Sequence, residues 1–454
     1  MGILEKINQF VWGIPALLLI LGVGLYLTVI TGFVQFRYFP EAIKRFFKSM
    51  TRKGDSQYRA LCTALAATVG TGNVIGVAGA IVIGGPGAMF WMWICAVLGM
   101  ATKFAEATLA VRYRVRNEIG EYTGGPMYII RCGLGKRWHW LAVCYSVFGL
   151  IASFGVGNAT QVNTCVSGIN ALLSYGGISV TKIGNLTIGI LIALTVAGVL
   201  FGGVKRIGDI VEKIVPFAAV GYVLLCAVVL SRNYTRIPAA FGLIFQGAFS
   251  PRAATGGLLG SAFCALRIGA ARGTFTNEAG MGTASIAHAN AEVVHPAVQG
   301  LMGIMEVFLD TICICTMTAL VILCSGIPVD YGMIAGGMLT MDAFSFSLGD
   351  WSVVPLSLSL CCFGVATVFG WSLYGGRCAQ FLFGVNSWKW YVIAQSAVAL
   401  LAVAFKTETL WMISEILNGL MSAPNLIALV FLSPELVRLL NSYNNGNNLT
   451  KGIF

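Results

Sequence analysis

Long charge-free apolar stretches recur along the chain and are separated by short polar segments. Two of them, 14–33 (IPALLLILGVGLYLTVITGF) and 184–200 (GNLTIGILIALTVAGVL), contain no charged residue. A helix of about 20 apolar residues crosses the roughly 30 Å hydrocarbon core of a membrane. The pattern predicts an all-α polytopic membrane protein with eleven transmembrane helices near 11–33, 58–82, 86–112, 139–173, 183–203, 208–231, 257–288, 294–324, 351–380, 385–404 and 410–433. Two further segments, 237–249 and 337–349, are expected to form helices on the outer surface.

The basic residues gather in alternate loops of this topology. Charged residues make up 10% of the chain and hydrophobic residues 57%, whereas a soluble domain carries about 25% charged residues. The net charge of +11 falls mainly in 34–57, 113–138 and 204–213, which the positive-inside rule places in the cytoplasm. We therefore expect a multi-pass protein of the cell inner membrane with an outer N-terminus and a cytoplasmic C-terminus. Its surroundings are the lipid bilayer, and no nucleic-acid partner is predicted.

No second domain or enzymatic motif is indicated. The chain reads as one transmembrane domain, 1–454, without a soluble module. The 13 cysteines lack metal-ligand spacing and are interpreted as small buried apolar residues. An intramembrane enzyme would need a nucleophile and a base at one depth, and the only pair to consider, Glu278 and His288, is ten residues apart. We expect the protein not to be an enzyme.

Two of the predicted helices are interrupted by glycine and polar residues. The stretch ATVGTGNVIG (67–76) lies in the middle of 58–82, and FTNEAGMG (275–282) lies within 257–288. Non-helical backbone at such a depth persists only where it lines a cavity or is buried in protein. One such stretch is also typical of close helix packing, but two in oppositely directed helices point to an inverted-repeat transporter. The repeats would be 58–231 and 257–433, with 11–33 outside them.

Five motifs carry a resemblance to a known family. GTGNVIGVAGAI, YTGGPMYII, FTNEAGMGTASIAHA, HPAVQG and FGWSLYGGRC occur in this order over nearly the whole chain. The sequence resembles the alanine or glycine:cation symporter family. The resemblance implies a LeuT-type fold of five plus five helices with one extra N-terminal helix. It implies sodium-coupled uptake of a small neutral amino acid, alanine and/or glycine, by alternating access. Proton coupling and glutamine as substrate are alternatives, and no oligomeric state beyond a monomer is indicated.

The amino-acid site is expected between the two interruptions. The resemblance and the chemistry of a half-helix N-terminus suggest that the substrate carboxylate meets the Thr71 and Gly72 amides and the Asn73 side chain. The ammonium would meet carbonyls of Thr68, Phe275 and Thr276. The walls are predicted to come from residues spaced i, i+4 and i+7 on one helix and from two bulky side chains: Phe154, Asn158, Gln161, Met281 and Trp371.

The sodium site is implied by the motifs of the fold. Backbone carbonyls of Ala66 and Val69, with Phe363 and Thr367, would provide the hard oxygen ligands that sodium needs. The family commonly has Ser-Thr where this chain has Ala366-Thr367, so one hydroxyl ligand is missing. This absence would weaken the site or shift coupling toward protons. A second cation site near Asn73 and Thr276 is a further interpretation.

Four charged residues are candidates for coupling or gating, because ionisable groups inside membranes are functional by default. Glu278 would cap amides of the second interruption, and Asp310 would either neighbour the cation path or pair with a polar group. Arg267 and Arg272 would form an outer gate or bind freed carbonyls. These alternatives are left open by the sequence.

Overall fold

A computed structural model describes residues 2–52, 54–249, 262–332, 338–404 and 407–451. The described chain consists of helices joined by turns and loops, and its one short antiparallel hairpin pairs β1 (Val115–Arg116) with β2 (Tyr122–Thr123). The first half contains α1 (Ile3–Val11), α2 (Ile14–Ile30), α3 (Val34–Arg37), α4 (Phe39–Met50), α5 (Ser56–Thr68), α6 (Val77–Gly84), α7 (Ala88–Tyr113), α8 (Pro126–Tyr128), α9 (His139–Phe154), α10 (Thr160–Tyr175), α11 (Lys182–Leu200), α12 (Gly203–Arg232) and α13 (Ile237–Phe249).

The second half continues with helices of the same kind. They are α14 (Ala262–Asn277), α15 (Thr283–His288), α16 (Pro296–Val307), α17 (Thr316–Ser325), α18 (Met338–Leu348), α19 (Val353–Phe383), α20 (Ser387–Leu401), α21 (Thr407–Phe431) and α22 (Ser433–Lys451). Four short π-helical segments interrupt or extend these helices: η1 (Gly72–Gly76), η2 (Ile129–Leu134), η4 (Gly155–Ala159) and η7 (Phe308–Cys315). The helix expected over 237–249 is present as α13, and α18 covers 338–348 of the expected 337–349, whereas their place on the outer surface stays a prediction.

Six described helices are long and apolar enough to cross a membrane, and each coincides with a predicted one. They are Ala88–Tyr113, Lys136–Tyr175, Lys182–Leu200, Gly203–Arg232, Pro296–Ser325 and Asp350–Phe383. Two bent pairs raise the number to eight, and one of these pairs joins α21 to a helical tail, α22, that the sequence pattern did not predict. The expected segments 11–33 and 385–404 appear as the shorter α2 and α20, and 257–261 lies outside the described residues. The number eleven therefore stays a prediction.

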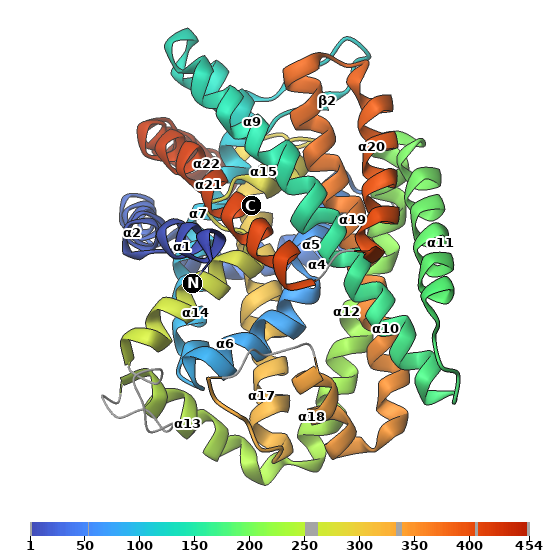
Figure 1. The fold of residues 1–454 in the computed structure, drawn as a ribbon. Helices are drawn as coiled ribbons and strands as arrows, with labels where there is room; N and C mark the ends of the chain where they lie inside the picture. Colours follow the sequence, from blue (N-terminus) through green and yellow to red (C-terminus); the bar gives the residue numbers. More distant parts are fainter. Residues whose placement is uncertain (1, 53, 250–261, 333–337, 405–406, 452–454) are drawn as a thin grey trace.

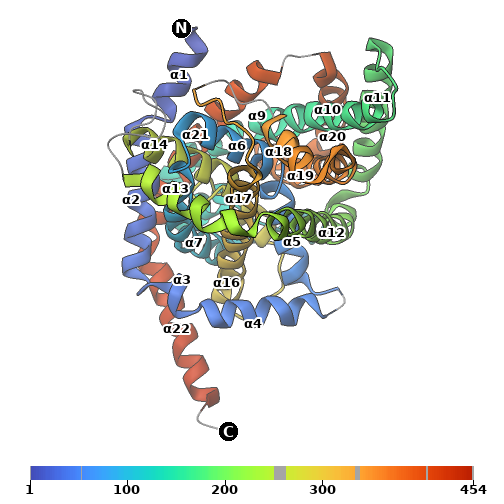
Figure 2. The ribbon, with the colours of Figure 1, turned by 90° about the horizontal axis from the view of Figure 1, so that it is seen from below.

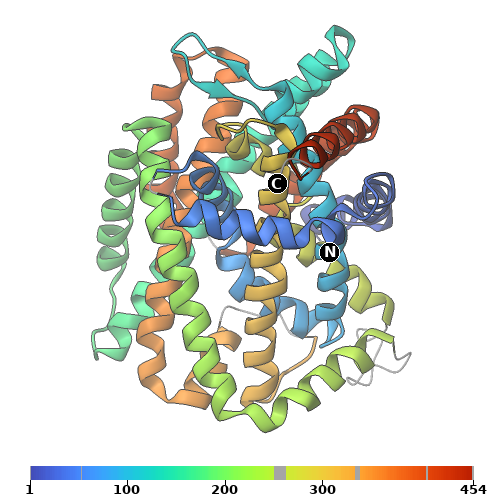
Figure 3. The ribbon, with the colours of Figure 1, turned by 180° about the vertical axis from the view of Figure 1, so that it is seen from behind.

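The long helices form a bundle with the two broken helices inside it. In Figures 1 and 3, α11, α12, α19 and α20 run side by side along one flank, while α2 and α22 are seen nearly end-on at the other. Figure 2 shows that α1 and α22 point to opposite sides and that α4 runs across one face. The broken helices α5–α6 and α14–α15 pack on each other, and α7 and α19 pack against both. This arrangement buries both interruptions.

Both predicted interruptions are present. Between α5 and η1 the chain leaves the helical conformation at Val69 (φ −75°, ψ 95°), and the two half-helices meet at an angle of 50°. Between α14 and α15, Glu278, Gly280 and Gly282 have φ values of 55°, 94° and 78°. These values lie in the left-handed region that favours glycine, so the glycines of the motif permit the second interruption. Below, residues 69–71 are called the first break and 278–282 the second break.

Candidate functional site: two broken helices joined by buried polar side chains

Asn73 holds the first break open. Its Oδ1 accepts the Gly70 N–H at 2.8 Å, an amide that would donate to the Ala66 carbonyl if the α-helix continued. Its Nδ2 donates to Asp310 Oδ1 at 2.7 Å and approaches Cys315 Sγ at 3.3 Å. The Asn73 side chain is fully buried. It therefore releases the Ala66 carbonyl from the helix and links the first break to η7.

The N-terminus of the second half-helix is exposed to the interior of the site. In the described chain, the N–H groups of Thr71 and Gly72 donate to no backbone carbonyl outside their own helix. Such orphan amides, together with the helix dipole, favour an anionic group. The Thr68 hydroxyl donates back to Ala64 O along α5 at 3.3 Å. The predicted carboxylate site is thus available as backbone geometry, and the Thr68 hydroxyl proton is already used within α5.

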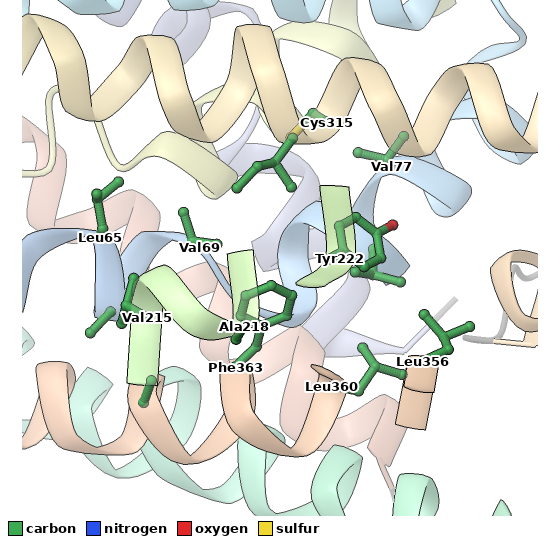
Figure 4. Packing of buried hydrophobic residues seen from close by; sticks show 14 of the residues in the cluster. Leu65, Val69, Val77, Val215, Ala218, Tyr222, Cys315, Leu356, Leu360 and Phe363 are labelled. Atoms are coloured by element: carbon green, nitrogen blue, oxygen red, sulfur yellow. The ribbon is translucent and has the colours of Figure 1, made fainter. Parts of the chain in front are cut away.

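A buried hydroxyl faces the first break. A Cβ atom placed on Gly70 would lie 2.7 Å from Thr367 Oγ1, which makes no hydrogen bond to any described residue although Thr367 is buried. Val69 and Phe363 belong to one apolar cluster with Val215 and Ala218 of α12 (Figure 4). Their side chains hold α5, α12 and α19 together and leave backbone oxygens as ligands. The structure thus places the Thr367 hydroxyl next to the residue whose amide has left the Ala66 carbonyl.

Side-chain acceptors also hold the second break. Asn277 Oδ1 accepts the Ala279 N–H at 3.0 Å, and Glu106 Oε1 accepts the N–H groups of Gly280 and Gly282, both at 3.0 Å. The Gly280 amide would donate to the Thr276 carbonyl in a continuing helix, so Glu106 releases that carbonyl. Glu106 lies on α7, far away in the sequence. The amide-capping role expected of Glu278 is therefore taken by Glu106.

Glu278 instead ties the second break to α19 and α15. Its Oε1 accepts the Trp371 indole N–H at 3.0 Å, and its Oε2 accepts the Thr283 hydroxyl at 2.5 Å. These bonds support the left-handed conformation of Glu278, which is uncommon for a residue with a Cβ atom. Met281 is completely buried in the apolar cluster that contains Trp371 and Phe275.

Asp310 connects the two breaks. Its Oδ1 accepts from Asn73, which follows the first break, and its Oδ2 accepts the Thr311 hydroxyl at 2.8 Å. Thr311 Oγ1 in turn accepts Asn277 Nδ2 at 3.2 Å, and Asn277 caps the second break. The helices beside the two breaks also meet directly, because a Cβ atom on Gly72 would lie 3.7 Å from Thr276 Oγ1. A single buried carboxylate is thus linked to both interruptions.

Only one residue of the predicted three-residue wall contacts the first break. Gln161 Oε1 accepts the Thr71 hydroxyl at 3.0 Å. Asn158 Nδ2 instead donates to Gln395 O on α20 at 2.7 Å, and the Phe154 ring packs on Tyr391 of α20 with centroids 5.6 Å apart. The reason is η4, because a π-helical turn contains an additional residue and rotates the positions before it relative to those after it. The expectation that Phe154, Asn158 and Gln161 share one α-helical face is therefore wrong.

The end of the site near α1 and α21 is closed by polar contacts. Arg272 Nη1 pairs with Glu415 Oε1 on α21 at 2.6 Å, and Asn8 of α1 donates to the other carboxylate oxygen at 2.8 Å. A pocket of about 150 Å³ here is lined by residues of the N-terminal helices, α14 and α21, among them Arg267 and Phe275. Thr340 of α18 also donates to the Val74 carbonyl at 3.1 Å. Arg272 thus contacts a carboxylate rather than a freed carbonyl.

A larger pocket lies at the other end of the bundle. Its volume is about 380 Å³, and Arg59, Arg377 and Glu121 are among the residues that line it. Arg377 Nη2 pairs with Glu121 Oε2 at 2.9 Å, and Arg59 pairs with Glu212 at 3.0 Å. Thr71, Asn73, Thr276 and Trp371 are at most 3% exposed, so the site is enclosed between these two ends.

Sequence reasoning missed Glu106 and Asn277. Glu106 and Lys103 lie within the apolar segment 86–112, and charged residues at such positions were a signal that was not used. Asn277 follows Thr276 directly, but its partner Thr311 is a contact between elements that the local pattern cannot reveal. The described residues contain no group of three or more His, Cys, Asp or Glu side chains suited to a metal.

Comparisons with known proteins agree with this geometry. The sequence model of the sodium:alanine symporter family matches residues 1–452 of this chain. The chain is 41% identical over 454 residues to the sodium/alanine symporter AgcS of Methanococcus maripaludis, covering 98% of this chain and 97% of that protein. It is 36% identical over 444 residues to the probable sodium/glutamine symporter GlnT of Bacillus subtilis, covering 96% and 89%. 

A solved structure shares the fold. The crystal structure of MhsT in complex with L-phenylalanine matches with a TM-score of 0.58 at 12% identity, covering 84% of this chain and 97% of that one. This likeness confirms the LeuT-type fold that the family resemblance implied. The matched family and the named relatives are transporters, which implies a transport protein rather than an enzyme. The chain belongs to the sodium:alanine symporter family of multi-pass membrane transporters.

Proposed function

We propose that the protein couples sodium entry to the uptake of a small neutral amino acid, alanine and/or glycine, by alternating access. The observation that carries this proposal is the pair of breaks, each held open by side-chain acceptors and both linked to Asp310. Opposed half-helices present orphan amides to an anion and released carbonyls to cations, which is what a zwitterion and a metal ion require. The name of the archaeal relative at 41% identity supports the same substrate and ion.

In this proposal the substrate lies across the first break. The N–H groups of Thr71 and Gly72 bind its carboxylate, while the Thr276 carbonyl, with Phe275 and Thr68, binds its ammonium. Gln161 orients Thr71 through the 3.0 Å hydrogen bond between their side chains. Trp371 and Met281 limit the space for the substrate side chain, which favours alanine and glycine. Glutamine is the second candidate, because the Bacillus relative carries that name.

The sodium ion is assigned to the oxygens around Gly70. The unpartnered Thr367 hydroxyl and the Ala66 carbonyl supply hard ligands there, with carbonyls of Val69 and Phe363 completing the set. Proton coupling is the alternative, because Asp310 is a buried carboxylate that joins both breaks and Ala366 lacks the hydroxyl that relatives commonly have. The proposal also includes the membrane topology. The two inverted repeats are 58–231 and 257–433, the N-terminus lies outside the cell, and the C-terminus lies in the cytoplasm.

Replacing Thr367 with valine should raise the sodium concentration that half-saturates uptake. The substitution preserves the β-branched shape and removes only the hydroxyl that faces Gly70. If one ligand contributes about 1–2 kcal/mol to the free energy of sodium binding, its loss weakens the sodium affinity roughly 5- to 30-fold. The measurement is initial uptake of labelled alanine by proteoliposomes over a range of sodium concentrations. An unchanged half-saturation would contradict the assignment of Thr367.

The outer ion pair is proposed to close the external path. Reversing either charge, with Arg272→Glu or Glu415→Arg, places like charges together and should slow uptake. If this partly buried ion pair contributes about 1–2 kcal/mol, its loss should decrease the rate of uptake roughly 5- to 30-fold. The double variant Arg272→Glu/Glu415→Arg restores the attraction and should recover most of the rate. If the double variant transports no faster than the single ones, the pair does not act as the gate.

The test of the function itself is uptake with imposed ion gradients. Proteoliposomes containing the purified protein receive labelled alanine, glycine or glutamine with an inward gradient of sodium alone or protons alone. Sodium-driven accumulation of alanine or glycine is the expected result. If only a proton gradient drives amino-acid accumulation, the proposed sodium coupling is wrong and proton coupling through Asp310 takes its place. If only glutamine accumulates, the proposed substrate is wrong and glutamine takes its place.

A further inference from the structure

Four buried oxygen atoms beside the second break have no hydrogen-bond partner among the described residues. They are Glu106 Oε2, Tyr145 Oη, Tyr374 Oη and Asn425 Oδ1. Glu106, Tyr145 and Asn425 are 0% exposed and Tyr374 is 1% exposed. Buried polar atoms in folded proteins are nearly always satisfied, so four such atoms in one region indicate a bound species.

These atoms come from four elements that converge behind the second break. Asn425 Nδ2 on α21 donates to Glu106 Oε1 on α7 at 2.7 Å and to Gly280 O at 2.9 Å. A Cβ atom on Gly282 would lie 2.7 Å from Asn425 Oδ1, so this oxygen faces the break. Tyr145 lies on α9 and Tyr374 on α19, where the Tyr374 ring packs on Trp371 with centroids 5.7 Å apart. The Trp371 indole in turn donates to Glu278 of the second break. The helices α9 and α19 also pack together.

The charges around these atoms are unbalanced. Glu306 accepts Lys103 Nζ at 3.0 Å and contacts His288 Nε2 at 2.9 Å, and all three side chains are buried. Gln299 Nε2 contacts His288 Nδ1 at 2.7 Å, so the other ring nitrogen, Nε2, is the one that faces Glu306. Lys103 therefore balances one carboxylate, whereas Glu106 and Glu278 lie in the same buried region. Among the described residues, Glu106 accepts hydrogen bonds only from uncharged donors, so a cation beside its second oxygen would supply the partner charge that the carboxylate lacks.

We propose that Glu106 Oε2, Tyr145 Oη, Tyr374 Oη and Asn425 Oδ1 bind a sodium ion behind the second break. All four are hard oxygen donors, and one carries negative charge, as a monovalent hard cation requires. Because Glu106 Oε1 also holds the Gly280 and Gly282 amides, the ion stabilises the geometry that releases the Thr276 carbonyl. This inference rests on the proposed sodium coupling and adds an ion to it. The site is distinct from the one at Gly70 and Thr367.

The test is equilibrium binding of radioactive sodium to the purified full-length protein. The double variant Tyr145→Phe/Tyr374→Phe keeps both rings and removes both hydroxyls, and Glu106→Gln keeps an oxygen for the break amides while removing the charge. Each should lower the number of sodium ions bound per protein by one. Thr367→Val should remove the other ion and leave this one. Tyr391→Phe is the matched control, because this buried tyrosine already donates to Ser153 and lies outside the group.

The outcomes separate this inference from the proposed function. Sodium binding that is lost with Thr367→Val but unchanged by the tyrosine double variant and by Glu106→Gln would overturn the inference alone and leave water as the occupant. Absence of sodium binding to the unsubstituted protein would overturn both. Loss of one ion in the tyrosine and Glu106 variants, with a monodisperse protein and an unchanged Tyr391→Phe control, is the expected result.

Discussion

Replacing Asn73 with leucine is expected to abolish sodium-driven alanine uptake while the protein still folds. Leucine removes the acceptor of the Gly70 amide and the donor to Asp310. The Gly70 amide is then able to return to the Ala66 carbonyl, which closes the first break and removes a sodium ligand. Two such hydrogen bonds, one of them to a carboxylate, contribute about 2–4 kcal/mol, or roughly a 30- to 700-fold loss of transport.

The measurement is initial uptake in proteoliposomes, with size-exclusion profiles and thermal unfolding to establish folding. Cys315→Ala is the matched control, because it removes only the weak thiol contact of the same asparagine at 3.3 Å and should leave uptake close to that of the parent. Normal transport by the leucine variant would show that Asn73 is not required at the site and that the first break does not depend on its side chain.

Replacing Glu106 with alanine is expected to cause a large loss of stability. One carboxylate oxygen accepts the Gly280 and Gly282 amides and the Asn425 side chain, all buried. Each buried donor left without an acceptor costs about 1–3 kcal/mol, so the free energy of unfolding should fall by at least about 3 kcal/mol. The second break should also lose its geometry, and alanine uptake with it.

Two variants make this result specific. Glu106→Gln retains an oxygen for the amides and should unfold close to the parent temperature. Glu118→Ala removes an exposed carboxylate and should change the free energy of unfolding by less than about 0.5 kcal/mol. Thermal unfolding of the purified proteins in one detergent compares the three variants. If alanine at position 106 is as stable as glutamine, the amides of the second break have another acceptor.

The sequence alone determined the features that depend on neighbouring residues. Apolar length specified a helical membrane protein, and the six clearest described helices coincide with predicted ones. Glycines beside polar residues identified both breaks, because glycine weakens a helix and permits the left-handed conformations found at Gly280 and Gly282. Asn73, Gln161 and Asp310 were identifiable because polar side chains are rare in apolar stretches.

Only the tertiary structure decided which acceptors hold the breaks and which side chains face them. Glu106 reaches Gly280 from another helix, and Asp310 joins Asn73 to Asn277 through Thr311, although no local pattern relates these positions. Asn158 turns to α20 because η4 changes the helical period, and a π-helical turn has no clear sequence signature. A backbone amide at a break bonds to the nearest available oxygen. Which oxygen is nearest depends on how distant helices pack, and packing is a property of the whole chain.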